Sequence, residues 1–258
     1  MKHTQIFFLG VLIFLIAYPG VRMVIENEGL ESKEKMTHTA YIEKDRMRAD
    51  LKGKEGDMTI IFRSDKGLFW SIDHKDKSYT EITKDDLSKM KKKMTEGLKM
   101  MEEEMKNLPP EQRKKIEEMM KGKMKAESPK VLYKKVATNQ KVNQWVCDKY
   151  EGYEGKERVE EVWTTDYKKL GLKSEELKVM EDMANFFSEI TKDLTSRLYK
   201  VGKEETGGFS GIPVRTFGYE KGKKVFAMEL KEIKKEEIKP VIFELPKGYK
   251  KEKFEIEE

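Results

Sequence analysis

Residues 36–82 read MTHTAYIEKDRMRADLKGKEGDMTIIFRSDKGLFWSIDHKDKSYTEI, and this stretch decides the fold. Short runs rich in Thr, Ile and aromatic residues, such as MTIIFR and GLFWSI, alternate with clusters of Gly, Asp and Lys. Such runs, with a turn signal at roughly every tenth residue, are typical of an antiparallel meander. The stretch therefore predicts five strands by residue 82.

The period of the apolar residues changes after this stretch. Apolar residues now recur at steps of three and four, which places them on one face of a helix with Lys and Glu on the other. The residues that share this face are Leu87, Met90, Met94, Leu98, Met101, Met105 and Leu108. Pro109 and Pro110 end this helix and begin a second one. The sequence thus predicts a Met-rich helical hairpin inserted at about residues 84–126.

Strand patterns return after the hairpin in VLYKKVAT, VNQWVCDKYE and RVEEVWTT. Ser174, a favourable N-cap residue, predicts the start of a further helix, and GIPVRTFGYE, KKVFAMELKEI and FELPKGY read as closing strands. The sum is an α+β fold in which a large antiparallel sheet curves and the helices cover its concave face. We expect one domain over residues 36–258, preceded by a polar connector at residues 21–35.

The N-terminal segment, residues 1–20, has the pattern of a secretory signal peptide. Lys2 precedes an apolar run from Ile6 to Ala17, and Pro19 then breaks the helix. The pattern predicts an exported protein that is periplasmic or otherwise extracytoplasmic. An uncleaved anchor in the inner membrane is the alternative, because no charged residue lies between His3 and Val21. No cysteine stands directly after the apolar run to accept a lipid, which excludes a lipoprotein.

Composition and motifs argue against several classes of function. Charged residues make up 39% of the chain, but 53 Lys and Arg are interleaved with 48 Asp and Glu, unlike the basic face of a nucleic-acid binder. The chain contains none of the sequence motifs HExxH, CxxC, GxSxG, GxxxxGK[ST] or GxGxxG. We therefore predict that the protein is not an enzyme and that it has no catalytic residue, metal site or cofactor. The single cysteine, Cys147, is either a small apolar strand residue or a reactive thiol.

The methionines of the first hairpin helix suggest a ligand site. Methionine is flexible and polarisable, so a Met-lined helix face adapts to varied apolar partners. The predicted ligand-binding residues are Met90, Met94, Met101 and Met105, with Phe69 and Trp70 from the preceding strands. The alternative is that these methionines fill the seam between helix and sheet and that the two aromatic residues belong to the core.

Several segments, taken in order, resemble an exported bacterial family catalogued as domain of unknown function four-four-one-two. The resemblance runs from about Tyr41 to Tyr249, and the segments are YIEKDRMRADLKGKEGDMTIIFRSDKGLFWSIDHKDKSYTEI, LPPEQRKKIEEMM, WVCDKYEG, EVWTTD, GIPVRT and FELPKGY. This family looks similar in architecture to the LolA/LolB-like lipoprotein carriers, which implies a half-open barrel and an envelope protein with an apolar ligand. The resemblance carries over no site residue, and the long charged hairpin departs from the carriers.

Two hypotheses of function follow from the sequence. The first is a non-catalytic cell-envelope protein that binds a lipid, an acyl chain or an apolar peptide under the Met-rich helical lid. The alternative is an envelope interaction or stress-sensing module with a filled core and no small ligand, whose partner is another envelope protein. Neither involves nucleic acid, and the membrane is contacted only through the N-terminal segment if it stays uncleaved.

Overall fold

The computed structural model describes residues 19–54, 56–106, 109, 111, 131–188 and 208–254. Over these ranges the strands are β1 Gly20–Gly29, β2 Glu34–Ile42, β3 Arg46–Gly53, β4 Gly56–Arg63, β5 Leu68–Asp73, β6 Ser78–Thr83, β7 Leu132–Val142, β8 Trp145–Glu154, β9 Glu157–Thr165, β10 Ile212–Glu220, β11 Lys223–Glu236 and β12 Lys250–Glu252. The helices are α1 Lys84–Lys106, the 3-10 helix η1 Tyr167–Leu170, α3 Ser174–Phe187 and the 3-10 helix η3 Pro240–Phe243.

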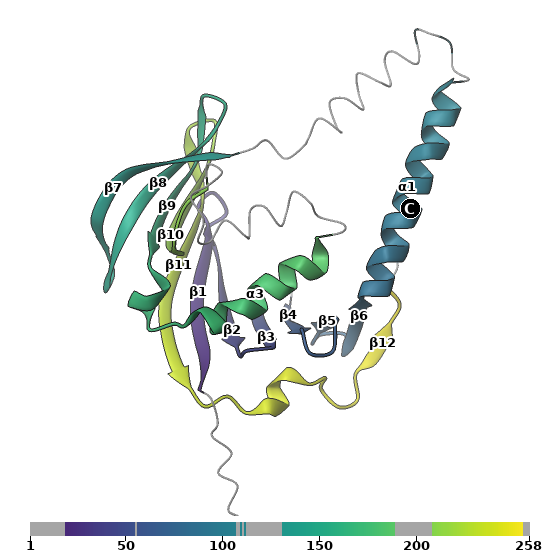
Figure 1. Ribbon diagram of the computed structural model, residues 1–258, viewed down its shortest axis with the longest axis horizontal. Helices are drawn as coiled ribbons and strands as arrows, with labels where there is room; N and C mark the ends of the chain where they lie inside the picture. Colours follow the sequence, from purple (N-terminus) through teal and green to yellow (C-terminus); the bar gives the residue numbers. More distant parts are fainter. Residues whose placement is uncertain are drawn as a thin grey trace, which may run out of the picture.

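All twelve strands form one strongly curved sheet (Figure 1). Their order is β12-β6-β5-β4-β3-β2-β1-β11-β10-β9-β8-β7, so β1 joins an N-terminal meander to a C-terminal one by pairing with β11. Ten of the eleven neighbouring strand pairs are antiparallel, as the Gly- and Asp-rich turns require. The predicted meander over residues 36–82 is present as β2 to β6.

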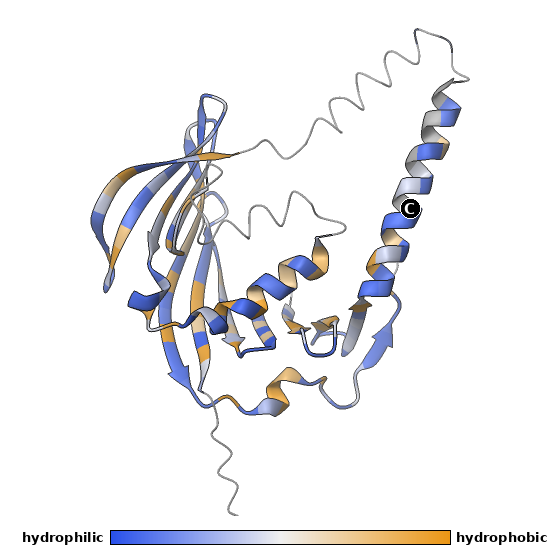
Figure 2. Cartoon of the chain, in the orientation of Figure 1, coloured by the Kyte–Doolittle hydropathy of each residue, from blue (hydrophilic) through white to orange (hydrophobic). Residues whose placement is uncertain are grey.

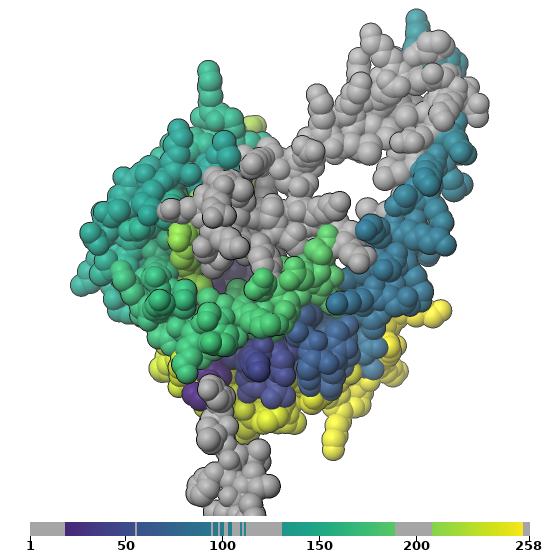
Figure 3. Space-filling view, viewed as in Figure 1, coloured from purple at the N-terminus to yellow at the C-terminus, as the bar shows by residue number. Residues whose placement is uncertain are grey.

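The predicted fold class is wrong in two respects. The sheet is mixed rather than wholly antiparallel, because the short strand β12 pairs in parallel with β6. It is also not closed into a barrel, and β7 and β12 remain its two edges. The physical reason lies in α3, which crosses the space inside the curve (Figure 3). Its buried side chains Val179, Ala184 and Phe186 occupy that space and hold the two halves of the sheet apart.

The long helix α1 does not cover the concave face, which corrects a second part of the prediction. β6 ends at Thr83 and α1 begins at Lys84, so no turn brings the helix back, and it extends away from the sheet (Figure 1). Thr83 and Asp86 cap its start, with the Thr83 N–H donating to Asp86 Oδ2 at 2.9 Å. Leu87 is buried and Met90 half-buried, whereas the described side chains beyond Met90 are exposed and mostly hydrophilic (Figure 2).

The expected connector at residues 21–35 is also different in the structure. Gly20–Gly29 form β1, a central strand whose Val21 and Met23 are buried. The polar residues that suggested a connector belong to the opposite face of this strand, where Arg22 binds Glu232 at 2.5 Å and Glu26 lies near Lys35. A strand between two others can be rich in charge on one face and apolar on the other.

The main core lies on the inner face of the sheet, which we define as the face that α3 covers. Phe62 of β4 meets Phe186 of α3 edge to face, with ring centroids 5.5 Å apart. Lys235 of β11 also binds Glu176 of α3 at 2.9 Å. Further buried residues of this core come from both halves of the sheet: Val21, Met23, Ile42, Val214, Ile212 and Leu230. The helix thus fixes the curvature of the sheet.

The C-terminal segment covers part of the opposite, outer face. Ile238 and Phe243 pack on Ile61, Trp70 and Ile72 in a second core. This segment contains FELPKGY, for which we predicted a strand; Phe243 instead ends η3, and β12 begins only after Tyr249. The aromatic and leucine residues that suggested a strand serve here to cover the outer face.

Some sequence predictions fall outside the described residues. These are the signal segment up to residue 18, the second hairpin helix over residues 112–130 and the end of the helix that begins at Ser174. Among the helices that the structure describes, none combines the length and apolar character needed to cross a membrane.

Candidate functional site

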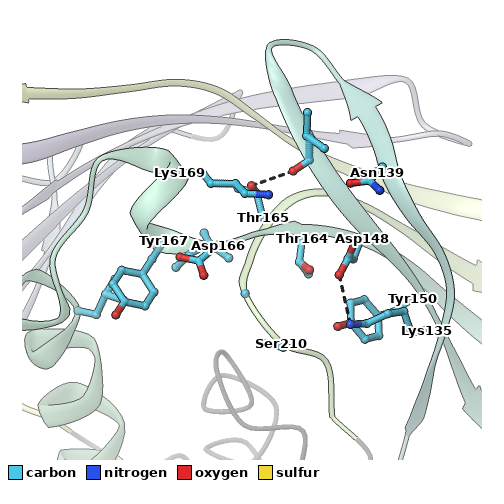
Figure 4. A pocket seen from close by; sticks show the side chains of 14 residues that line it. Lys135, Asn139, Asp148, Tyr150, Thr164, Thr165, Asp166, Tyr167, Lys169 and Ser210 are labelled. Atoms are coloured by element: carbon cyan, nitrogen blue, oxygen red, sulfur yellow. Dashed lines mark hydrogen bonds and ion pairs between the residues drawn. The ribbon is translucent and has the colours of Figure 1, made fainter.

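A pocket of about 500 Å³ lies on the inner face at the β7 end of the sheet (Figure 4). Its walls come from β7, β8 and β9, from η1 and α3, and from residues 210–212, which lead into β10. Ten of the fourteen residues that line it have polar side chains, and these are the ten labelled in Figure 4. Its volume is within the range of small-molecule sites.

One end of the pocket is formed by two neighbouring strands. Because side chains alternate along a strand, Val146, Asp148 and Tyr150 of β8 all point to the pocket. Lys135 pairs with Tyr150 in the β7–β8 ladder, and its Nζ lies 3.2 Å from Asp148 Oδ2 and 5.4 Å from the centroid of the Tyr150 ring. Figure 4 shows these three polar side chains gathered together. An ion pair and an aromatic hydroxyl thus share one end.

Among the residues that the structure describes, the hydroxyl of Tyr150 has no hydrogen-bond partner. Tyr150 is only 3% exposed, because Phe209 covers its ring with centroids 6.2 Å apart. A buried hydroxyl without a partner costs about 1–3 kcal/mol of desolvation free energy. Native proteins retain few such groups, so each one calls for an explanation, and a hydroxyl at the wall of a pocket is well placed to bind a ligand.

The opposite end of the pocket is built where β9 gives way to η1. Asp166 caps the 3-10 helix, its Oδ1 accepting a hydrogen bond from the Lys168 N–H at 2.8 Å. Gly171, with φ of 73°, ends the helix in the left-handed region. This tight turn places Tyr167 and Lys169 at the pocket, where Figure 4 shows them together with Asp166.

A strip of hydroxyl groups joins the two ends. Thr164 and Thr165 are both buried, and Thr165 Oγ1 donates to the Val146 carbonyl at 3.0 Å. Gly211, with φ of 94°, allows the chain to pass close to them, because a Cβ there would lie 2.7 Å from the Thr165 carbonyl oxygen. Apolar surface is contributed by Val146, Leu177 and Ile212.

The charges of the pocket balance. The lining contains two lysines, Lys135 and Lys169, and two aspartates, Asp148 and Asp166, but neither histidine nor cysteine. Cys147 follows Val146 in the chain, so strand alternation turns it away from the pocket, and it is 1% exposed among other buried apolar residues. Burial raises the pKa of its thiol, which disfavours the reactive thiolate. The structure therefore places Cys147 as a small buried residue, the first of the two alternatives that the sequence left open.

Of the residues predicted from sequence to bind a ligand, the structure describes the side chains of Phe69, Trp70 and Met90. Phe69 lies on the inner face, in edge-to-face contact with Phe187 at 5.1 Å, whereas Trp70 lies in the outer core and donates to Glu81 at 2.8 Å. Met90 is half-buried near the start of α1. The side chains of Met94, Met101 and Met105 lie outside what the structure describes. None of the three described side chains, Phe69, Trp70 and Met90, lines the pocket.

The pocket residues themselves were missed from the sequence. The segment WVCDKYEG, residues 145–152, reads as a strand, and alternation along it puts Asp148 and Tyr150 on one face. A polar pair two residues apart on a strand that faces a core is a usable signal. The contribution of Lys169 and Gly211 depends on tertiary structure and left no such signal.

The outer face of the same strands carries a different polar cluster. Glu161 is 5% exposed and accepts hydrogen bonds from Lys149 at 2.6 Å, from the Tyr219 hydroxyl at 2.5 Å and from Arg158 at 3.1 Å. Burial alone would raise the pKa of Glu161, but these hydrogen bonds outweigh it and lower the pKa. Burial and the bond to Glu161 raise the pKa of Tyr219 to about 12. This closed network is structural.

Metal binding finds no support among the described residues, which hold no group of three or more His, Cys, Asp or Glu able to bind an ion. The sequence itself matches no protein-family model and no curated protein.

Comparison with solved structures finds likenesses of the chain as a whole. One is to an uncharacterized conserved protein from Thermus thermophilus, with a TM-score of 0.46 and 9% identity over 92% of this chain and 91% of that one. Another is to PNGF-II, with a TM-score of 0.36 and 8% identity over 91% of this chain and 31% of that one. Likenesses this distant do not bear on function.

Proposed function

We propose that this protein is a non-catalytic binding protein that holds a small ligand in the pocket between β7–β9, η1 and α3. The observation that carries the proposal is the buried Tyr150 hydroxyl, which lines the pocket and lacks a partner. A ligand that offers a hydrogen-bond acceptor there would recover the desolvation cost of this group.

The rest of the lining is consistent with binding rather than chemistry. The Lys135–Asp148 ion pair and the Asp166 cap both hold charged groups in fixed structural contacts. Binding sites of this kind combine an apolar surface, here Val146, Leu177 and Ile212, with a few fixed polar groups that orient the ligand.

We also propose that the protein acts in the cell envelope. The support is the N-terminal segment at residues 1–20, with its positive start and apolar run. Fractionation of cells that express the full chain tests this, with an N-terminal sequence to separate a cleaved signal from an anchor. Recovery of the intact chain in the cytosol would refute it.

Blocking the pocket tests the binding function. Val146 and Val136 are both exposed valines on neighbouring strands, at 45% and 48%, but only Val146 lines the pocket. We expect mass spectrometry to find a small molecule released on denaturation of the wild type and of Val136→Trp, and little or none from Val146→Trp. Equal amounts from the two variants, or none from the wild type, would refute the proposal.

An apolar ligand on the inner face, as the sequence suggested, is a second candidate. Three exposed apolar side chains, Met36, Met58 and Phe226, lie on this face, because strand pairing aligns them with the face that carries Ile25. Displacement of an apolar dye by dodecanoate, abolished by Met36→Lys but not by Met100→Lys on α1, would support it. No dye binding would favour an interaction module with a filled core.

A further inference from the structure

We propose that the ligand of the pocket is a neutral saccharide, held by its hydroxyl groups. This inference rests on the proposed binding function and names the class of ligand. It is carried by three properties of the lining: balanced formal charge with one ion pair already formed, a high density of hydrogen-bonding groups, and an aromatic ring at one end.

The charge of the pocket favours a neutral ligand. Lys135 and Asp148 neutralise each other at 3.2 Å, so a charged ligand would compete with an ion pair that is already formed. An anion would meet Asp148 and Asp166 as well as the two lysines. The paired carboxylate of Asp148 still keeps lone pairs, which a hydroxyl group can use without disturbing the pair.

The polar groups match the chemistry of a polyol. A hydroxyl group donates one hydrogen bond and accepts up to two, so a ligand with several hydroxyls serves donors and acceptors alike. The pocket offers the donor Lys135, the acceptor Asp148, the amide of Asn139 and the unpartnered Tyr150 hydroxyl. A fatty acyl chain would leave most of these groups without partners, at a cost in affinity.

The far end supplies an aromatic surface. Tyr167 is half-buried at the pocket, on the opposite side from Tyr150 in Figure 4. The C–H face of a sugar ring can pack on an aromatic ring while its hydroxyl edge binds polar groups. The pocket thus presents hydrogen-bonding groups at one end and an apolar platform at the other, as an amphipathic sugar ring requires.

Ligand-observed NMR on the full chain tests the class of ligand. The panel contains the neutral sugars maltose, cellobiose and diacetylchitobiose, with glucuronate, glycine betaine and dodecanoate as charged or apolar competitors. We expect saturation transfer to at least one neutral sugar and to none of the others. Binding should be lost in Val146→Trp and about tenfold weaker in Tyr150→Phe, which removes one hydrogen bond.

Matched controls come from the neighbouring outer-face residues. Tyr153 lies on the same strand but bonds to Glu151 at 2.6 Å, and Lys134 precedes Lys135 but lies over the Tyr153 ring. Tyr153→Phe and Lys134→Met should leave sugar binding within about twofold, whereas Lys135→Met should weaken it several-fold.

The outcomes separate the two proposals. Binding of betaine, glucuronate or dodecanoate that Val146→Trp abolishes would overturn the saccharide class and leave the binding function standing. Sugar binding unaffected by Tyr150→Phe and Val146→Trp would overturn the saccharide assignment for this pocket. Absence of binding to the whole panel would overturn the saccharide class, and absence of any released molecule from the native protein would overturn the binding function as well.

Discussion

The two faces of the sheet at its β7 end handle buried polar groups in opposite ways. On the outer face, the buried Glu161 carboxylate has hydrogen bonds from Lys149, Tyr219 and Arg158. On the inner face, the buried Tyr150 hydroxyl has no partner. A satisfied buried group stabilises the fold, whereas an unsatisfied one lowers stability and is retained where it serves another purpose. The difference supports our proposal that this part of the outer face is structural and that the inner face binds a ligand.

Both arrangements come from one short stretch of sequence. In DKYEGY, Asp148 and Tyr150 point inward while Lys149, Glu151 and Tyr153 point outward. Strand alternation alone separates two polar environments that are adjacent in the chain. Substitutions in and around this stretch can therefore test the comparison with closely matched controls.

The largest effect is expected from the apolar core beneath α3, which both polar regions depend on. Phe62→Ala removes a side chain that is 2% exposed and in contact with Phe186. We expect a loss of about 4 kcal/mol in the free energy of unfolding, measured by urea denaturation. Phe217→Ala on the half-exposed outer face, where Lys224 lies 3.9 Å from its ring centroid, should cost less than half as much. Equal losses would contradict the placement of the core.

Removing the outer carboxylate should have the next largest effect. Glu161→Gln keeps the shape but turns an amide toward Lys149 and Arg158, so that, among the described residues, Glu151 is the one carboxylate still paired with them. We expect a loss of about 3 kcal/mol in the free energy of unfolding. Glu157→Gln, at an exposed position on the same strand, should change it by less than about 0.5 kcal/mol. A change at Glu161 as small as at Glu157 would show that the network contributes little.

Acid should remove a stabilising interaction from the outer face. Burial would raise the pKa of Glu229, but hydrogen bonds from Asn143, Lys231 and Arg215 lower it to about 2. The folded pKa is below the unfolded value, so the stabilisation is complete above about pH 4.5 and is lost as the pH falls toward 2. We expect Glu229→Gln to reduce the slope of stability against pH in this window. An unchanged slope in urea titrations at several pH values would contradict it.

Strand alternation and turn residues made most of the sheet predictable from the sequence. The open edges of the sheet and the pocket could not be predicted in this way. The β2–β6 meander followed from short runs separated by Gly and Asp. β1 was missed because Glu26 and Glu28 reflect one charged face of a central strand rather than a connector. The open form of the sheet depends on where α3 packs, and the pocket depends on Gly211 approaching Thr165, both long-range contacts. Contacts between residues far apart in the chain cannot be predicted from the local sequence pattern.

Tyr219 of the outer face and Tyr150 of the inner face can be compared directly, and we expect the larger effect on stability from Tyr219. Tyr219→Phe removes a hydrogen bond to the buried Glu161 and leaves that carboxylate one partner short. We expect a loss of about 2 kcal/mol in the free energy of unfolding at neutral pH. The pKa of Tyr219 is also raised to about 12 in the folded protein. Its stabilisation is therefore complete below about pH 10, the unfolded pKa, and is lost as the pH rises from there through about 12. In an ultraviolet titration of the folded protein, the tyrosine ionisation near pH 12 should be absent from this variant.

Tyr150→Phe should have the smallest effect on the fold, and of the opposite sign. It deletes a buried hydroxyl that has no partner, so it removes a desolvation cost and no hydrogen bond. We expect the free energy of unfolding of the ligand-free protein to stay unchanged or to rise by up to about 1 kcal/mol, measured by urea denaturation after ligand has been removed by refolding. Tyr153→Phe, which loses a bond to Glu151 on the outer face, should fall slightly instead. A clear loss of stability in ligand-free Tyr150→Phe would mean that the hydroxyl supports the fold, and the separation of the two faces would then fail at its central residue.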